Sequence, residues 1–500
     1  MVTSKGKMDF TTGKIFLKFI WFTLPIILTN LLQVVYNIAD MMVVSLSPEK
    51  NAVGAIGTTS SFVHLVTNLC IGVAVGANVV LARHIGAQDS VRAEKTVHTS
   101  VWLAGILGVI CMAIGLAVSY PVLSLMGNRG DVLRLATVYA MVYFAGVPFL
   151  LLTNFLSAIF RAKGNAKLPL VVLSLSGIVN VVLNLFFVVI VGWSVEGVAL
   201  ATAISNVLSA VILAWKLTKE TDETKLCFKK LKLDKQECKE MLYIGLPAGL
   251  QSALFSLSNM LIQSSVVRVN NSVLTEMYGG AFPPDVYQPV VSGNASAQNL
   301  ETFVYTSMNA VYQSAITVTS QNVGAKKPER LRNVVRCAFV STLIVALVMG
   351  GILFALKKPL LSMYGVVEGA EGSLEAVAMQ TALTRLYFIC IPYALAGWME
   401  DWSGMLRGLG KSMVSTVISI FGAIIFRIVW IFTVFQAYPT LQSIFISYPI
   451  SWILTGVIAH IAVQIYIRKF KKQCENEVTK QEENGRENNI GKDDRAVQED

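Results

Sequence analysis

The sequence predicts an all-α polytopic membrane protein with twelve transmembrane helices in two six-helix bundles. Of its 500 residues, 54% are hydrophobic and only 14% are charged, whereas about 25% of the residues of an average soluble chain are charged. Only helices and closed barrels satisfy their backbone polar groups in lipid. Barrel strands alternate polar and apolar residues, but this chain has long unbroken apolar runs, which predict helices.

Twelve runs have about the 20 residues that a helix needs to cross a bilayer. We place them at 16–44, 52–82, 97–120, 132–160, 168–193, 197–216, 241–267, 294–323, 333–356, 380–406, 412–436 and 441–467. The first run is too long, and too polar at its end, for a cleaved signal peptide. We therefore expect it to be retained.

The distribution of basic residues predicts the orientation of these spans. The formal net charge is +10, but Lys and Arg collect in alternate connections, such as 216–239 and 326–336, rather than on one nucleic-acid-binding surface. The positive-inside rule then places both termini in the cytoplasm of a cell (plasma) membrane protein. We expect the lipid bilayer, and no nucleic acid, as a partner.

Several short motifs occur once in each half of the chain. Their pairs are Leu24-Pro25 with Leu246-Pro247, Ile85-Gly86-Ala87 with Val323-Gly324-Ala325, and Tyr143-Phe144-x-x-Val147-Pro148 with Tyr387-Phe388-x-x-Ile391-Pro392. Each half has six spans and starts on the cytoplasmic side, so we expect parallel repeats with the transported molecule between them.

The expected domain boundaries follow from these spans. They are an N-terminal bundle at 1–216, a Lys-rich cytoplasmic linker at 217–240, and a C-terminal bundle at 241–468 with an external loop at 269–293. The last stretch, 469–500, is rich in Glu, Lys, Asn, Asp and Gln. Such a composition predicts a disordered cytoplasmic tail.

Neither a metal site nor an enzyme active site is apparent. The seven cysteines form no CxxC pair and the four histidines do not cluster, so the spacing predicts no metal or redox cofactor. No nucleophile–base pair stands out in the spans. We expect a protein that is not an enzyme and has no cofactor.

Polar residues in the first half converge on one acid. The first span carries Thr29, Gln33, Tyr36, Asn37 and Asp40 at offsets typical of one helical face. A carboxylate inside a membrane is costly and usually functional, so Asp40 is the expected coupling group. Asn180, Asn184 and Thr202 are expected to complete its pocket, although hydrogen bonding between helices would explain the two asparagines equally well.

A second polar stripe predicts the cavity wall of the other half. Glu301, Tyr305 and Asn309 follow four-residue spacing, and Asn259 lies on a similar stripe of the preceding span. Glu301 is interpreted as a second protonation site or as a partner for Arg427.

Two further features of the spans leave alternatives open. Neighbouring helix positions point in different directions, so at most one of Glu400 and Asp401 should face the cavity; pairing with Arg407 or Arg427 is the alternative role for these acids. Pro25 removes a backbone hydrogen bond and bends a helix. That bend would either link protonation to shape or be a static kink.

Three segments resemble the multidrug and toxic compound extrusion (MATE) family of prokaryotic type. They are L-P-I-I-L-T-N-L-L-Q-V-V-Y-N-I-A-D from Leu24, G-N-A-S-A-Q-N-L-E-T-F-V-Y-T-S-M-N-A at 293–310 with S-Q-N-V-G-A at 320–325, and L-R-G-L-G at 406–410. The resemblance implies a V-shaped central cavity and antiport of cationic or amphiphilic compounds against H⁺ or Na⁺.

The resemblance also implies roles for individual residues. It implies that Asp40 binds the coupling cation, H⁺ or Na⁺, and that this acid is surrounded by polar residues, namely Gln33, Tyr36, Asn180, Asn184 and Thr202. The chain departs from some relatives at Asn184, where they carry a second acid.

Together with this resemblance, the observations predict a cation-coupled antiporter for multidrug efflux that works by alternating access as a monomer. The alternative is a flippase for lipid-linked saccharides or other lipids. Anionic head groups need several cavity arginines, and the sequence places only Arg427 clearly within a span. The third hypothesis is a receptor or a membrane enzyme that does not transport. The parallel repeat argues against it, because such repeats are typical of transporters that work by alternating access.

Overall fold

The computed structural model describes residues 7–47, 49, 51–283 and 286–496. The described residues are helices and short connections, without a strand. In the first half these are α1 (Ile15–Val44), α2 (Ala52–Gly86), α3 (Ser90–Leu125), α4 (Gly130–Ala162), α5 (Lys167–Leu185), the π-helical turn η1 (Phe186–Ile190) and α6 (Val195–Thr218).

The second half follows a short connection that contains the 3₁₀ turn η2 (Phe228–Lys230). Its elements are α7 (Lys235–Met277), α8 (Pro289–Gly324), α9 (Pro328–Met363), α10 (Leu374–Arg385), η3 (Leu386–Cys390), α11 (Tyr393–Gly408), α12 (Ser412–Ser419), η4 (Ile420–Ile425), α13 (Phe426–Phe432), α14 (Val434–Ala437) and α15 (Leu441–Ala496).

The helices have the length and composition of membrane spans. Within the described residues, 10 helices are long and apolar enough to cross a bilayer, or 11 if α10 with η3 and α11, bent by 46° at their junction, are one span. The polar helix α8 is not among them, although it is 36 residues long. The all-α, multi-pass fold class is therefore confirmed, whereas the count of twelve stays a prediction.

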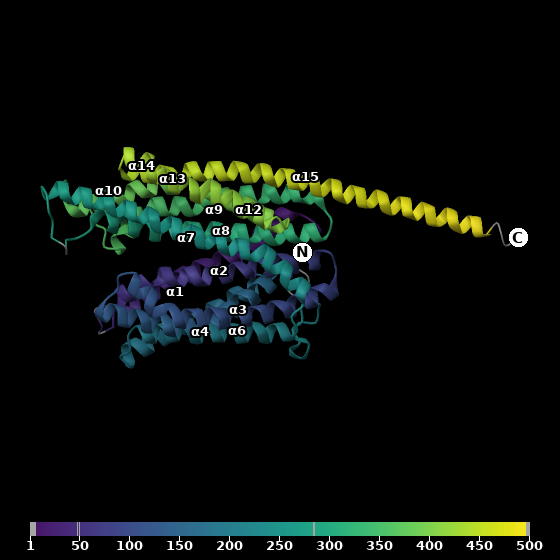
Figure 1. The fold of residues 1–500 in the computed structure, drawn as a ribbon, viewed down its shortest axis with the longest axis horizontal. Helices are drawn as coiled ribbons and strands as arrows, with labels where there is room; N and C mark the ends of the chain where they lie inside the picture. Colours follow the sequence, from purple (N-terminus) through teal and green to yellow (C-terminus); the bar gives the residue numbers. More distant parts are fainter. Residues whose placement is uncertain (1–6, 48, 50, 284–285, 497–500) are drawn as a thin grey trace.

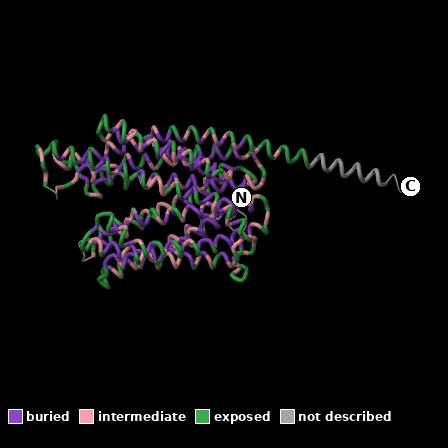
Figure 2. Tube along the Cα trace, in the orientation of Figure 1, coloured by how far each residue is buried: buried purple, intermediate pink, exposed green. Residues whose placement is uncertain are grey.

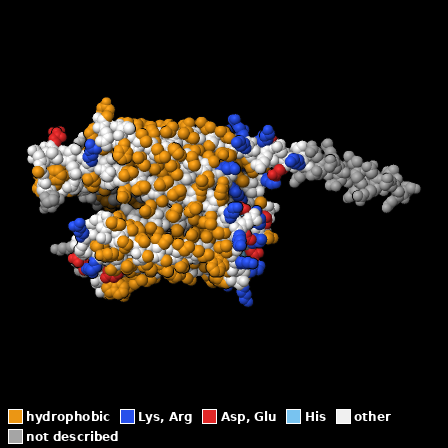
Figure 3. Space-filling view, in the orientation of Figure 1, with side chains coloured by type: hydrophobic (Ala, Val, Ile, Leu, Met, Phe, Trp, Pro, Cys, Tyr) orange, Lys and Arg blue, Asp and Glu red, His pale blue; other side chains and the backbone are white. Residues whose placement is uncertain are grey.

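The two halves lie side by side and form a V. They meet at the end that holds the N-terminus and diverge toward the other end (Figure 1). Buried residues gather where the halves meet (Figure 2). Hydrophobic side chains cover the middle of the molecule, and most of the visible Lys and Arg side chains lie at the end near the N-terminus (Figure 3).

Glycines allow the halves to meet at backbone distance. A Cβ atom on Gly72 of α2 would lie 2.3 Å from the Cα atom of Gly249 in α7, and one on Gly76 would lie 2.1 Å from the Met241 carbonyl oxygen. Small residues four apart let two membrane helices approach closely. The α2–α7 contact therefore requires glycine at these positions, because a side chain there would collide with the backbone of α7.

The segment before α1 also connects the two halves. Phe10 is fully buried and packs edge-on against Phe22, with ring centroids 5.0 Å apart. Its backbone N–H donates to Oε1 of Gln321 in α8 over 3.3 Å. The N–H of Met8 donates to the carbonyl oxygen of Gly164, after α4, over 3.3 Å. Residues 8–10 thus lie between the two halves.

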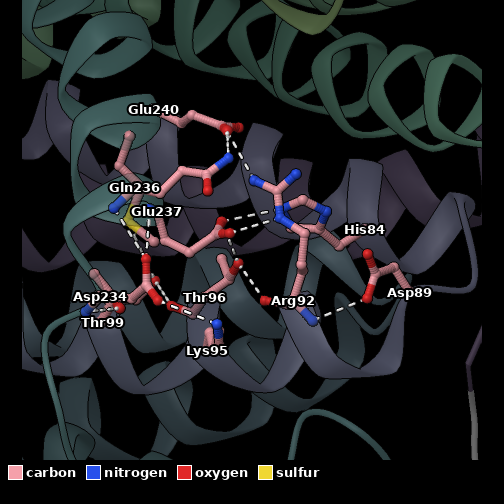
Figure 4. A network of polar contacts seen from close by, with 12 residues as sticks. His84, Asp89, Arg92, Lys95, Thr96, Thr99, Asp234, Gln236, Glu237 and Glu240 are labelled. Carbon is pink, nitrogen blue, oxygen red and sulfur yellow. Dashed lines mark hydrogen bonds and ion pairs between the residues drawn. The ribbon is translucent and has the colours of Figure 1, made fainter.

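A polar network joins the start of α7 to the first half (Figure 4). Glu237 accepts hydrogen bonds from Arg92 Nε over 2.8 Å and from Thr96 Oγ1 over 2.9 Å, and its Oε2 lies 3.0 Å from His84 Nε2. Arg92 also donates to Glu240 over 2.7 Å. One guanidinium therefore bridges two carboxylates at this junction.

The structure differs from three of the expected boundaries. Because α7 continues to Met277 and α8 begins at Pro289, the connection is shorter than the expected loop at 269–293. The linker is likewise shorter than 217–240, because α6 ends at Thr218 and α7 begins at Lys235. The helices α6, α7 and α8 all extend into polar sequence beyond the predicted apolar runs.

The third difference is the tail. Where disorder is expected from residue 469, α15 continues as one helix to Ala496; residues 497–500 lie outside the described part. Glu, Lys, Gln and Arg are good helix formers, which explains why this polar sequence continues the helix.

Candidate functional site

Asp40 heads a chain of hydrogen bonds that crosses three helices. Nδ2 of Asn184 in α5 donates to the Asp40 carboxylate and lies 3.3 Å from Oδ1 of Asn180. Nδ2 of Asn180 donates to Oγ1 of Thr202 in α6 over 3.3 Å. The structure therefore brings together the four residues that the sequence proposes as one pocket.

The pocket has an unused acceptor beside the carboxylate. Asn184 is fully buried, and its Oδ1 has no hydrogen-bond partner among the described residues. Two residues later, α5 gives way to the π-helical turn η1, a distortion that is frequent at functional sites. The pocket thus offers carboxylate and amide oxygens, the ligands that hard cations prefer.

The other polar residues of α1 are placed differently. The Tyr36 hydroxyl donates to the carbonyl oxygen of Ser174 over 3.1 Å, and a Cβ atom on Gly177 would lie 1.9 Å from the Tyr36 ring. Tyr36 therefore fastens α1 to α5. Gln33 and Asn37 are exposed and lie outside the hydrogen-bonded chain of the described residues.

Two tyrosines near Asp40 were not predicted as site residues. Tyr139 and Tyr143 of α4 lie within electrostatic range of the Asp40 carboxylate. The repeated Tyr143-Phe144-x-x-Val147-Pro148 motif was the available signal for Tyr143, but it was interpreted only as a repeat.

Pro25 lies inside α1, which runs as one helix from Ile15 to Val44. Its carbonyl oxygen accepts a hydrogen bond from Thr29 Oγ1 over 2.8 Å. The role of Pro25 as a bend, linked to protonation or static, stays a prediction.

A second polar site is a cavity of about 500 Å³ in the second half. It is lined by residues of α7, α8, α10, α11, α13 and α15, and by Asn68 of α2 in the first half. Its polar and charged lining includes Asn259, Glu301, Tyr305, Asn309, Arg385, Glu400, Arg407 and Arg427.

Glu301 is paired with Arg385. Nη2 and Nε of Arg385 donate to the two carboxylate oxygens over 2.5 and 3.1 Å, and Nη1 donates to Asn294 over 2.8 Å. The two-bond geometry is the strong form of this interaction. The expected partnership of Glu301 with Arg427 is therefore wrong in this structure, because Arg385, which the sequence analysis did not single out, occupies the carboxylate.

Of the adjacent acids, Glu400 lines the cavity. It accepts hydrogen bonds from the Tyr305 hydroxyl over 2.9 Å and from Asn309 over 3.3 Å. Asp401 faces α9 instead and accepts a bond from Thr342 over 2.5 Å. One acid of the pair faces the cavity, as their adjacency predicts. In the described residues neither acid forms an ion pair with Arg407 or Arg427, so that alternative is not met.

The comparisons with known proteins identify this architecture. A sequence model described as MatE matches residues 25–186 and 288–433, which is more than half of the chain. The chain belongs to the MatE family. Like the other members of this family, it is a multi-pass membrane transporter rather than an enzyme, and transport by MATE proteins needs no cofactor.

Two curated relatives match most of the chain. The chain is 27% identical over 411 residues to "Probable multidrug resistance protein YoeA" of Bacillus subtilis (strain 168), covering 80% of this chain and 82% of that protein. It is 23% identical over 427 residues to "Multidrug export protein MepA" of Staphylococcus aureus (strain NCTC 8325 / PS 47), covering 84% and 88%.

Solved structures confirm the MATE fold. One is the outward-facing conformation of a multidrug resistance MATE family transporter of the MOP superfamily, with a TM-score of 0.82 at 22% identity, covering 94% of this chain and 99% of that one. Another is a MOP superfamily transporter from Pyrococcus furiosus Vc1 (DSM3638), described as having a binding pocket of reverse polarity. It has a TM-score of 0.82 at 22% identity and covers 92% and 98%.

Proposed function

We propose that this MATE protein is an antiporter that exports cationic or amphiphilic compounds across the cell membrane in exchange for H⁺ or Na⁺. The names of two relatives, a probable multidrug resistance protein and a multidrug export protein, support the export of such compounds. The single observation that carries the coupling is the contact between Asp40 and Asn184.

Asp40 is suited to bind a cation because its carboxylate has amide partners and no cationic side chain in its hydrogen-bonded chain. A proton would neutralise the carboxylate directly. Na⁺ would bind to the carboxylate oxygens and to the unpartnered Oδ1 of Asn184. Either ion removes a charge whose burial in the membrane is costly, and so would change the packing of α1 on α5.

Alternating access requires the V to open at either end. If the positive-inside rule holds, the Lys- and Arg-rich end in Figure 3 is cytoplasmic and includes both termini. The V in Figure 1 then opens outward. In our proposal, twelve spans form two six-helix parallel repeats that rock about the α2–α7 contact, and one monomer is the transporting unit.

The experiment that tests this function uses proteoliposomes loaded with ethidium as the probe. A pH gradient and a Na⁺ gradient are applied separately, and ethidium movement is followed by fluorescence. We expect wild-type protein to respond to at least one gradient and Asp40→Asn to lose that response. Asp131→Asn is the matched control, because Asp131 is exposed at the start of α4.

Two results would contradict the proposal. Gradient-driven transport that persists in Asp40→Asn would remove Asp40 from the coupling step. Absence of gradient-driven transport in correctly oriented wild-type protein, for ethidium and a panel of amphiphiles, would exclude the antiport function itself.

A further inference from the structure

The cavity of the second half contains more positive than negative charge. It is lined by three arginines, Arg385, Arg407 and Arg427, and by two acids, Glu301 and Glu400, which is a formal excess of one positive charge. All three arginines are at least 95% buried. Of the three, only Arg385 forms an ion pair with a carboxylate in the described part of the chain.

Arg427 uses only one of its N–H donors in a hydrogen bond with the described residues. Its Nε donates to Ser451 Oγ over 2.9 Å, and its Cζ lies 4.2 Å from the centre of the Tyr448 ring. A guanidinium has five N–H donors. Its four remaining donors have no protein acceptor among the described residues, although the side chain is only 3% exposed and lines the cavity.

Arg407 is similar. It donates to Gln251 over 2.9 Å and to the Tyr312 hydroxyl. Its Nε is buried without a partner among the described residues. Neutral acceptors compensate a buried cation poorly, and among the described residues neither Arg407 nor Arg427 forms an ion pair with a carboxylate.

We infer that this cavity binds the anionic group of an amphiphilic substrate, a carboxylate or a phosphate, with Arg427 as the main ligand and Arg407 as a second. This inference rests on the proposed export function and names the substrate chemistry of its second-half cavity. A planar guanidinium forms two parallel hydrogen bonds with such anions. The rings of Tyr448 and Trp452, which also line the cavity, would pack against the apolar body of the substrate.

The test compares two probes that differ in one methyl ester and therefore in one charge. Rhodamine 110 carries a free carboxylate, and rhodamine 123 is its methyl ester. Binding of each to purified full-length protein in neutral detergent is measured by fluorescence anisotropy for wild type, Arg427→Gln and Arg427→Lys. Arg332→Gln, on the exposed surface of α9, controls for the loss of one positive charge.

We expect wild type and Arg332→Gln to bind rhodamine 110 more tightly than its ester. Arg427→Gln should weaken the binding of rhodamine 110 by about tenfold or more, which is typical of losing a charge-assisted hydrogen bond. Its affinity for the ester should stay within about twofold of the wild-type value, because the ester lacks the anionic group that Arg427 would bind. Arg427→Lys should keep part of the preference, because it retains the charge without the two-bond geometry.

Two results overturn the inference: a wild type without preference for the carboxylate, or an Arg427→Gln protein that loses both probes equally while its melting temperature is unchanged. Ethidium transport in proteoliposomes separates this failure from failure of the export function. Adding phosphatidylglycerol or inorganic phosphate distinguishes the source of the anion. Competition by the lipid alone indicates that the site takes a lipid phosphate, whereas competition by inorganic phosphate indicates a soluble anion. Either competition supports the anion site if it is absent in Arg427→Gln.

Discussion

Arg385 and Glu301 form a buried ion pair between α10 and α8, with both carboxylate oxygens engaged. Removing one partner of such a pair leaves an uncompensated charge. Replacing both with apolar residues is far less costly.

We therefore expect Arg385→Met to lower the free energy of unfolding by about 3–5 kcal/mol. The double variant Arg385→Met/Glu301→Met should recover most of that loss. Thermal unfolding in detergent, followed by tryptophan fluorescence, measures both. A double variant less stable than Arg385→Met would show that the pair stabilises the fold by more than mutual neutralisation.

The contact between Gly86 and the end of α8 predicts a second effect. A Cβ atom on Gly86 would lie 2.0 Å from the carbonyl oxygen of Gln321, so Gly86→Ala must push the two halves apart. We expect a lower melting temperature by overpacking, which costs about 1–3 kcal/mol.

Gly350→Ala is the control for this substitution. Gly350 is inside α9 with open space around its Cβ position, and alanine is a better helix former than glycine by about 1 kcal/mol. The control should therefore be at least as stable as wild type. Equal effects of the two alanines would contradict the close approach of the halves.

The buried ring of Phe10 indicates that the segment before α1 stabilises the end at which the two halves meet. Because its ring is fully buried, Phe10→Ala should destabilise the protein by about 3–5 kcal/mol. Phe10→Ala should also make a maleimide label an introduced Met8→Cys faster, because the segment would detach from the two halves and expose residue 8. The control Phe16→Ala removes a ring that is 43% exposed and should leave the labelling rate unchanged, whereas slow labelling in Phe10→Ala would contradict the role of this ring.

Lys163, just after α4, predicts a pH dependence. Burial lowers the pKa of Lys163 to about 8, although Glu220 lies 3.0 Å away. Because the unfolded chain holds this proton up to about its usual pKa of 10.4, the unfolded state binds more protons between these values. The contribution of Lys163 to stability should therefore rise from about pH 8 to about pH 10.4.

The measurement is the melting temperature of wild type minus that of Lys163→Met across this pH range. The difference should increase with pH, whereas the same comparison with exposed Lys230→Met should show no such rise. A flat or falling difference for Lys163→Met would show that the buried amine keeps its ordinary pKa.

The first-half site could be predicted from the sequence to a large extent. Asp40, Asn180, Asn184 and Thr202 are polar residues in apolar runs, and lipid tolerates such residues only where they meet partners. Helical spacing then places them on the inward faces. Tyr36 has the same spacing, yet its ring packs on Gly177, a neighbour that periodicity cannot identify.

The charges of the second half could be predicted less well. Arg385 and Arg407 lie at the ends of one apolar run, where basic residues usually face the membrane surface. The bend between α10 and α11 and the depth of the cavity turn them inward. No periodicity in one helix shows which side chain from another helix will meet Glu301.

By itself, the sequence determined the membrane environment, the helical class and the acid at Asp40, because lipid imposes the same demand on every backbone and every charge. Only the tertiary structure decided that Asn184 meets Asp40, that Arg385 pairs with Glu301, and that Arg407 and Arg427 form no ion pair among the described residues. These outcomes depend on which helices pack together and how closely, and that depends on contacts such as those of Gly86 and Gly249, which join residues far apart in the chain.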